Sequence, residues 1–241
     1  MARVALSVIL MLICLADLSP AEARMRNAAD IEMKTTDGRK VVMPKNYICP
    51  PILSEYLDQY SITGGDRLKS KLFRQLHQGQ DIVAPLGTKV YASCDGVVEI
   101  SDFHWAGGER TVVKCDHNPL DHRTIYEVGY HYSKRLAKKA DRVRQGETML
   151  GLLGFTGEGR GPAPHYHREL RAASGWNLIE ASPDRKRIGM IIWNQGTTVN
   201  PHDYWLGAKG AETVVIPPYE AVVRMEPKQG YVYPLRCAKK R

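Results

Sequence analysis

The chain has 241 residues, of which 43% are hydrophobic and 25% charged, so wholesale disorder is excluded and a core of useful size can be buried. The formal net charge of +8 favours an anionic partner, such as a cell wall or a lipid surface. No nucleic-acid-binding motif accompanies the scattered lysines and arginines, so no nucleic-acid partner is expected.

Residues 1–23 have the pattern of a secretory signal peptide. Arg3 precedes an apolar run from Val4 to Leu15, and the small-x-small sequence Ala21-Glu22-Ala23 follows. The run is shorter than the roughly 20 residues that span a bilayer, and no second stretch of the sequence approaches that length. We therefore expect a protein exported to the periplasm, or secreted to the cell wall, that is not an integral membrane protein.

Residues 24–60 are predicted to form an irregular N-terminal segment that ends in a short helix at 52–60, after Pro50-Pro51. From about residue 80 the chain becomes rich in β-forming residues separated by turn signals. Strands are expected at 82–84, 89–93, 97–101, 111–115, 124–132, 143–146, 149–155 and 165–171. Many short strands with frequent turns indicate a mainly β fold with an antiparallel sheet rather than alternating βαβ units.

Outside these strands, residues 133–140 are basic and compatible with a short helix. In the C-terminal part, residues 213–216 and 221–224 are strand candidates.

Four cysteines remain after removal of the signal peptide, and an even number in an oxidising compartment predicts two disulfides with three possible connectivities. If residues 97–101 pair with 111–115 across a glycine loop, Cys94 comes near Cys115. That pairing leaves Cys49 to join Cys237 and tie both ends of the chain to the domain.

Three groups of histidines can carry chemistry. His165-Tyr166-His167 is the one His-x-His sequence in the chain, and positions i and i+2 of a strand project to the same face. Two imidazoles could therefore converge there on one ion or one substrate atom. His131 lies at the end of the strand expected at 124–132.

His77 and Asp81 form a second candidate pair of metal ligands, because zinc accepts imidazole nitrogen and carboxylate oxygen. Four fully extended residues would separate them by about 13 Å, so the chain must curl between them, and Gly79 permits this. His117 and Asp121 have the same spacing, but they lie in a polar run with an internal proline. The pair at 77 and 81 leads directly into an apolar strand and is favoured.

Residues 77–170 resemble the lysostaphin-type, or LytM-type, zinc metallopeptidases that cut peptidoglycan cross-bridges. The matching segments occur in the same order along the chain, which makes the set more specific than any one part. They are His77-Gln-Gly-Gln-Asp81 with its following strand, Asp95-Gly96-Val97-Val98, Tyr130-His131, the glycine-rich stretch from 143 to 157, His165-Tyr166-His167 and, more weakly, Asn200-Pro201.

Carried over residue by residue, the resemblance implies one Zn²⁺ per chain, bound by His77, Asp81 and His167. Three protein ligands leave one coordination position for water, as catalytic zinc requires. His131 and His165 would flank that water as catalytic residues, although His122 or His117 could in principle take the place of His131.

Together with the patterns described above, the resemblance gives the expected organisation of the chain. A signal peptide at 1–23 and an N-terminal segment at 24–60 precede a peptidase domain at 61–206, and a C-terminal extension at 207–241 packs on the domain. The domain would have an antiparallel β-sheet core with short peripheral helices. Tyr166, Arg168 and Tyr132 depart from the family pattern and could reshape the substrate groove.

The function implied is an exported zinc metalloendopeptidase that hydrolyses peptide cross-links of bacterial peptidoglycan with a zinc-activated water. The sequence does not determine the oligomeric state, and a monomer is favoured. A catalytically inactive module that binds cell wall or activates an amidase is the alternative, although such modules typically lack a metal ligand. A secreted peptidase that attacks proteins would use the same site.

Overall fold

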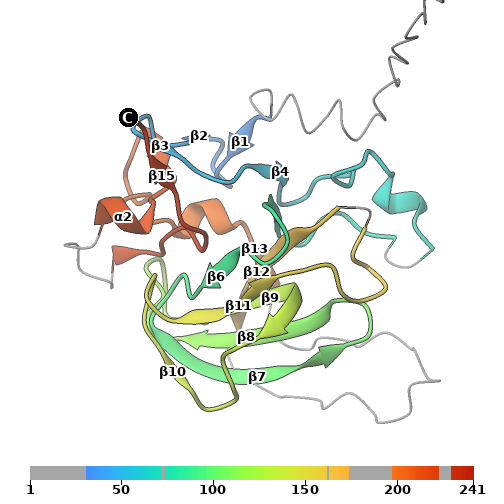
Figure 1. Cartoon of the computed structure of the whole chain (residues 1–241). Helices are drawn as coiled ribbons and strands as arrows, with labels where there is room; N and C mark the ends of the chain where they lie inside the picture. Colours follow the sequence, from blue (N-terminus) through green and yellow to red (C-terminus); the bar gives the residue numbers. More distant parts are fainter. Residues whose placement is uncertain (1–30, 72–73, 162, 174–196, 223–228) are drawn as a thin grey trace, which may run out of the picture.

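The computed structural model describes residues 31–71, 74–161, 163–173, 197–222 and 229–241. The predicted signal peptide lies outside these residues. Within them, one large sheet carries most of the fold, and its central strands run side by side in the order β7, β8, β9 and β12 (Figure 1). These strands are β7 (Gly96–His104), β8 (Gly108–Cys115), β9 (Thr124–Arg135) and β12 (His165–Ala173).

Every pairing in this sheet is antiparallel. Beyond β12 the sheet continues through β5 (Gln80–Val83) to β4 (Ile52–Ser54), and beyond β7 it ends at β10 (Arg142–Val143). Three further strands pair off this path: β6 (Lys89–Tyr91) with β11 (Met149–Leu153), β11 with β9, and β13 (Thr197–Val199) with β12. The predicted antiparallel, mainly β fold is confirmed.

The two ends of the described chain lie together on one side of the large sheet (Figure 1). A small sheet joins β1 (Met33–Lys34), β2 (Lys40–Val42) and β14 (Thr213–Val215), in which β14 runs parallel to β2. A two-stranded sheet joins β3 (Tyr47–Ile48) to β15 (Ala238–Lys239). Among the residues that the structure describes, the short helices are the 3-10 helices η2 (Arg67–Lys69) and η3 (Pro201–Tyr204) and the α-helix α2 (Tyr219–Val222).

Both predicted disulfides are present. Cys94 is bonded to Cys115 within the β7–β8 hairpin region, and Cys49 is bonded to Cys237 next to the β3–β15 pair. The hydrophobic core includes side chains from both the large sheet and the C-terminal segment, among them Ile82, Tyr132, Leu170, Trp205, Tyr231, Tyr233 and Leu235.

The strands expected between residues 82 and 171, and the one expected at 213–216, are found near their expected places, but three other predictions are wrong. The helix expected at 52–60 is absent: residues 52–54 form strand β4, because Ile52 pairs with Ile82 of β5, and an irregular stretch with a turn at residues 56–57 follows. The helix-compatible residues from 133 continue β9 to Arg135, since Lys134 pairs with Leu152 of β11. The strand expected at 221–224 begins within α2, and its last two residues lie outside the described residues.

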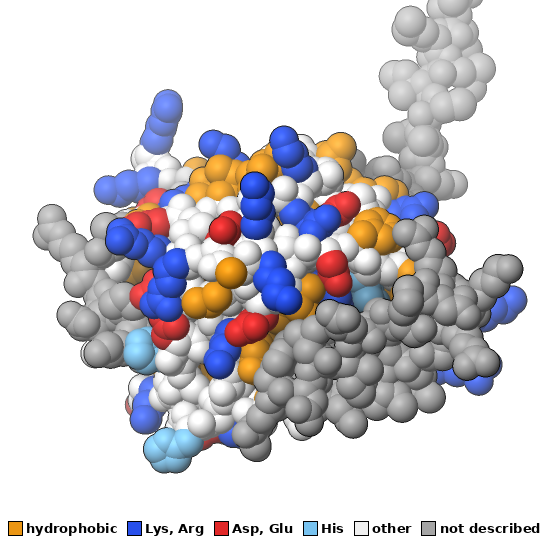
Figure 2. Space-filling view, turned by 90° about the horizontal axis from the view of Figure 1, so that it is seen from below, with side chains coloured by type: hydrophobic (Ala, Val, Ile, Leu, Met, Phe, Trp, Pro, Cys, Tyr) orange, Lys and Arg blue, Asp and Glu red, His pale blue; other side chains and the backbone are white. Residues whose placement is uncertain are grey.

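Charge is dispersed on the face that Figure 2 shows, where Lys and Arg side chains are interspersed with Asp and Glu. Among the described residues, none lies in a helix long and apolar enough to cross a membrane.

Candidate metal centre

The two faces of β12 have different environments because alternate side chains point to opposite sides of a strand. Tyr166, Arg168 and Leu170 are completely buried on the core side. His165, His167 and Glu169 lie on the other side, where the polar site is built. Tyr166 and Arg168 therefore pack in the core and do not reshape a groove, contrary to expectation.

Strand pairing brings distant residues to this polar side. His167 lies opposite Asp81 on β5 and opposite Tyr130 on β9. His77 reaches the same place because the chain curls before β5, as predicted. A Cβ atom at Gly79 would lie 2.2 Å from the carbonyl oxygen of Arg168, so only glycine fits this close approach.

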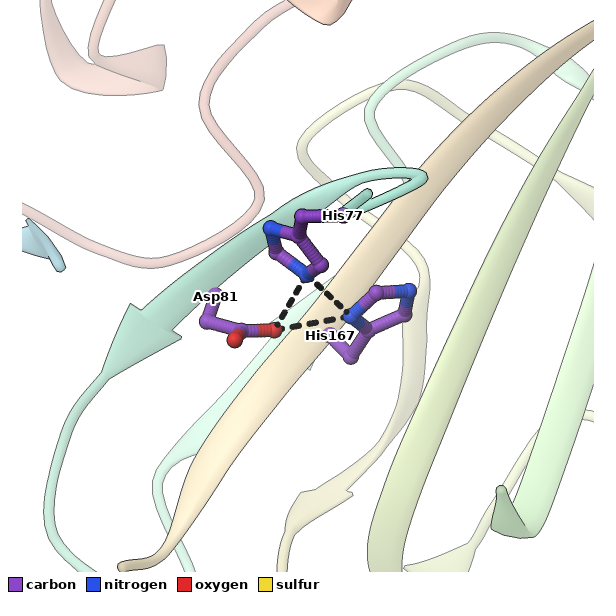
Figure 3. Close-up of side chains that lie close together, drawn as sticks. All are labelled: His77, Asp81 and His167. Carbon is purple, nitrogen blue, oxygen red and sulfur yellow. Dashed lines mark hydrogen bonds and ion pairs between the residues drawn. The ribbon is translucent and has the colours of Figure 1, made fainter. Parts of the chain in front are cut away.

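Three side chains converge on one point (Figure 3). His77 Nε2 lies 3.1 Å from Asp81 Oδ1 and 3.0 Å from His167 Nδ1, and His167 Nδ1 lies 2.7 Å from Asp81 Oδ1. Ligand atoms about 2.0–2.1 Å from a tetrahedral zinc ion are roughly 3.3 Å apart, so a small expansion of this triangle would admit the ion. Among the described residues, this is the one group of three or more His, Cys, Asp or Glu with such an arrangement.

The outward nitrogens of both imidazoles have acceptors that orient the rings. His77 Nδ1 donates to the main-chain carbonyl of Glu55 at 2.8 Å, and His167 Nε2 donates to Glu169 Oε1 at 3.0 Å. The inward nitrogens are thereby left to bind a cation beside the carboxylate of Asp81. Outer hydrogen bonds of this kind fix the tautomer of a metal-ligating histidine, so the donor set fits zinc.

In the metal-free chain, a proton on His167 supplies the positive charge among the three ligand side chains. Burial opposes the charged form of His167, but hydrogen bonds to Asp81 and Glu169 outweigh it and raise the pKa of His167 to about 9. Burial lowers the pKa of His77. Although burial opposes ionisation of Asp81, the surrounding histidines hold its pKa well below the usual value. His167 Nδ1 can then donate to Asp81 while His77 Nε2 accepts.

His131 and His165 lie beside this triangle. Their ring centroids are 4.7 Å apart, and His165 Nε2 is 3.6 Å from Asp81 Oδ1. The Nδ1 atoms donate to the carbonyls of Thr156 and Ala163, each at 2.8 Å, which leaves both Nε2 atoms as proton acceptors. Burial is the main reason why the pKa values of both rings are lowered, and the pKa of His131 falls to about 3. Both rings are therefore neutral near pH 7.

His131 also has an unusual backbone conformation. Its φ of 66° lies in the left-handed region, which a non-glycine residue seldom adopts within a strand. The pairing of β9 with β8 shifts register between Gly129 and Tyr132, a stretch that contains His131, and its pairing with β11 shifts register just after, between Tyr132 and Lys134. The backbone distortion therefore lies at the residue whose ring neighbours His165.

The competing candidates do not join the site. The carboxylate of Asp121 is held by Arg123 and Asn118 in a surface loop. His117 and His122 line a separate cavity of about 550 Å³ next to β8 and β9. Of the sequence-predicted residues, the structure therefore brings together His77, Asp81, His131, His165 and His167.

Three polar residues at the site were missed from the sequence. Glu169 could have been found, because it lies two residues after His167 on the same face of a strand. Arg67, whose Nη2 lies 3.0 Å from Asp81 Oδ2, comes from η2, which precedes β5. Glu55 acts through its main-chain carbonyl, which has no signature in the sequence.

The chain is similar to several solved structures. The catalytic domain of the M23 protein EnpA from Enterococcus faecalis is 22% identical, with a TM-score of 0.40, and the match covers 66% of this chain and 92% of that one. The catalytic domain of lysostaphin from Staphylococcus simulans is 24% identical, with a TM-score of 0.41, and the match covers 51% and 80%.

Curated relatives match part of the chain at higher identity. The peptidoglycan DD-endopeptidases ShyC and ShyA of Vibrio cholerae are 41% and 38% identical over 91 and 96 residues, which are 37% and 39% of this chain. The chain spans about a fifth of the length of each, 19% and 20%. The L-Ala–D-Glu endopeptidase of Bacillus subtilis is 30% identical over 135 residues, which are 52% of this chain and 37% of that relative.

A family model also matches part of the chain. Residues 75–178 match the model of peptidase family M23, and this range contains all five of the histidine and aspartate side chains that converge in the structure. The matched range, somewhat less than half of the chain, is therefore similar to peptidase family M23.

Proposed function

We propose that the protein is an exported zinc metalloendopeptidase that hydrolyses peptide cross-links of bacterial peptidoglycan. One observation carries the proposal: two imidazole nitrogens and one carboxylate oxygen lie within 3.1 Å of one another, beside two further neutral imidazoles. The names of the Vibrio relatives support peptidoglycan as the substrate.

In this proposal His77 Nε2, Asp81 Oδ1 and His167 Nδ1 hold the zinc ion. When bound, zinc supplies a Lewis acid that polarises the scissile carbonyl and lowers the pKa of a coordinated water. The remaining steps belong to the side chains of the protein.

His131 and His165 are the groups proposed to move the proton. An Nε2 atom of one ring accepts a proton from the attacking water, which adds to the amide carbon. The resulting imidazolium stabilises the negative charge on the carbonyl oxygen and then returns the proton to the leaving amine. Because the Nδ1 atoms are fixed by main-chain carbonyls, each ring presents only Nε2 to the reaction.

The proposed location outside the cytoplasm is supported by the signal-peptide pattern of residues 1–23 and by the two disulfides, which persist in oxidising compartments. A monomeric state and the absence of a nucleic-acid partner remain predictions. The alternative, an inactive module that binds cell wall or activates an amidase, is less well supported because the chain retains the complete ligand set.

The test is digestion of defined muropeptides by the wild-type protein and by His165→Ala, with zinc quantified in both. We expect one zinc per chain in each protein, and release of peptide by the wild type alone. Zinc-loaded wild type that cleaves no muropeptide, together with no effect of His165→Ala, would overturn the enzyme proposal. Cleavage of proteins but not of muropeptides would replace the substrate.

A further inference from the structure

A turn in the N-terminal segment holds His77 from several directions. The main-chain N–H of His77 donates to the carbonyl of Asp58 at 3.0 Å, and the carbonyl of His77 accepts from the N–H of Leu57 at 2.8 Å. The imidazole Nδ1 donates to the carbonyl of Glu55 at 2.8 Å and lies 3.1 Å from Ser54 Oγ. Residues 54–58, here called the His77 clamp, therefore hold both the backbone and the ring of this residue.

The clamp is fastened in turn by η3 from the C-terminal part of the chain. His202 Nε2 donates to Glu55 Oε2 at 2.7 Å, and Trp205 Nε1 donates to His202 Nδ1 at 2.9 Å. The side chain of His202 is 1% exposed and that of Glu55 is 10% exposed. A hydrogen bond in such a low-dielectric position is costly to break, because its partners would be left buried and unpaired.

We propose that Glu55 and His202 are positioning residues that set the affinity of the metal centre. Their pair fixes the clamp, and the clamp fixes the direction of His77 Nε2 toward Asp81 and His167. Both residues lie outside residues 75–178, the range that matches the family model. The metal centre of this chain thus extends into its N-terminal and C-terminal parts.

The proposal rests on the proposed zinc site and adds to it two residues of this chain that hold one of its ligands in position. Removal of an outer hydrogen-bond partner of a metal-ligating histidine typically costs about 10–100-fold in metal affinity. The Glu55–His202 pair acts one step further out, because a variant with a shortened Glu55 side chain still has the main-chain carbonyl that accepts from His77 and loses only the contact that fixes its position. We therefore expect the low end of that range, about tenfold.

The experiment compares the full chain with two variants that break the pair in different ways. Glu55→Ala removes the acceptor, and His202→Phe keeps an aromatic ring but removes both nitrogens. The zinc dissociation constant is measured by competition with a chromophoric chelator, well below the unfolding temperature. We expect it to rise about tenfold in each variant. Glu55→Gln keeps an acceptor oxygen for His202 and should restore most of the affinity.

A matched control uses a second carboxylate that secures the C-terminal segment but does not contact the clamp. Glu220 pairs with Arg236 and accepts from the N–H of Cys237. Glu220→Gln should leave the zinc dissociation constant unchanged, even where it lowers the Tm of the metal-free protein. A purely structural role of Glu55 would likewise lower Tm without changing zinc affinity.

Unchanged zinc affinity in Glu55→Ala, or an equal loss of affinity in Glu220→Gln, would overturn the positioning role while leaving the zinc site intact. A wild-type chain that binds no zinc would instead overturn the proposed metal centre itself.

Discussion

Glu169 holds His167 from the side opposite the proposed metal position. The two residues lie two positions apart on β12, and Glu169 Oε1 accepts from His167 Nε2 at 3.0 Å. The other oxygen of Glu169 is held by Arg171 Nε at 2.8 Å, and Arg171 Nη2 continues to Gln78 Oε1 at 3.2 Å. Glu169 is 6% exposed, so this row of polar side chains is a buried support of the site.

Replacement of Glu169 should weaken metal binding. In Glu169→Ala, His167 Nε2 loses its acceptor, and neither the ring orientation nor the tautomer is fixed any longer. We expect the zinc dissociation constant to rise about 10–100-fold, measured by chelator competition. Replacement of the exposed Glu147, which lies outside the site, serves as the control and should have no effect. Wild-type affinity in Glu169→Ala would contradict this role.

Zinc binding should release a proton near neutral pH. Despite burial, the hydrogen bonds to Asp81 and Glu169 raise the pKa of His167 to about 9, so the metal-free chain holds this proton at pH 7. A metal ligand must be neutral imidazole, so the bound zinc replaces the proton. We expect about one proton released per zinc at pH 7, and affinity that falls about tenfold per pH unit below 9.

Calorimetry in two buffers of different ionisation enthalpy measures this proton release. Glu169→Ala removes one cause of the raised pKa, so it should release fewer protons at pH 8 than the wild type. A wild-type titration with the same heat in both buffers at pH 7 would show that His167 is already neutral.

The two flanking histidines should affect hydrolysis more than metal content. Since asparagine tolerates a left-handed backbone, His131→Asn is better suited to the φ of 66° than alanine. We expect His131→Asn and His165→Ala each to keep one zinc and to lose about 10²–10⁴-fold in kcat, the usual contribution of a general acid or base. Metal analysis together with muropeptide cleavage separates the two effects. Loss of zinc in parallel with activity would instead assign these rings to metal binding.

Much of the fold was predictable because local signals and strand pairing agree. In β7, buried positions such as Val98 and Ile100 alternate with more exposed ones, and the pattern was visible in the sequence. Residues 52–54 show the opposite case. Their local sequence after two prolines suggested a helix. They form a strand instead, because they pair with β5, which lies about 30 residues later in the chain.

Only those residues of the candidate site that belong to short sequence motifs were predictable. The spacing of His77 and Asp81 required a curl, and Gly79 indicated where it could occur. By contrast, the Glu55 carbonyl reaches His77, and the His202 ring reaches the side chain of Glu55, through tertiary contacts of residues that carry no motif. The burial of Arg168 was equally hidden, because a charged residue in the core depends on its partners, here Glu127 on β9 and Trp205 directly after η3.

Arg168 forms a completely buried ion pair with Glu127, at 2.9 Å, and its guanidinium also lies 4.6 Å from the ring centre of Trp205. Glu127→Ala should lower the free energy of unfolding by about 3–5 kcal/mol, because it leaves an uncompensated buried charge. The double variant Glu127→Leu with Arg168→Met removes both charges and should recover most of the loss. Denaturant unfolding measures both. A double variant no more stable than Glu127→Ala would show that packing, not charge, is the cause.

The two disulfides should differ in their contribution to stability. A cross-link restricts the unfolded chain more when the residues it joins are further apart. Cys49 and Cys237 are 188 residues apart, whereas Cys94 and Cys115 are 21 apart, which corresponds to about 5 and about 3 kcal/mol in the chain-entropy model.

The shorter cross-link also joins a region in which the strands already pair, since Gly96 lies opposite Cys115 in the β7–β8 hairpin. Residual hairpin structure in the unfolded chain would reduce its effect further. We therefore expect serine replacement of Cys49 and Cys237 to lower the free energy of unfolding more than serine replacement of Cys94 and Cys115. Urea titration of the two double variants, each compared with the oxidised wild type, tests this order. The reverse order would mean that local strain or packing at the cysteines outweighs the entropy of the unfolded chain.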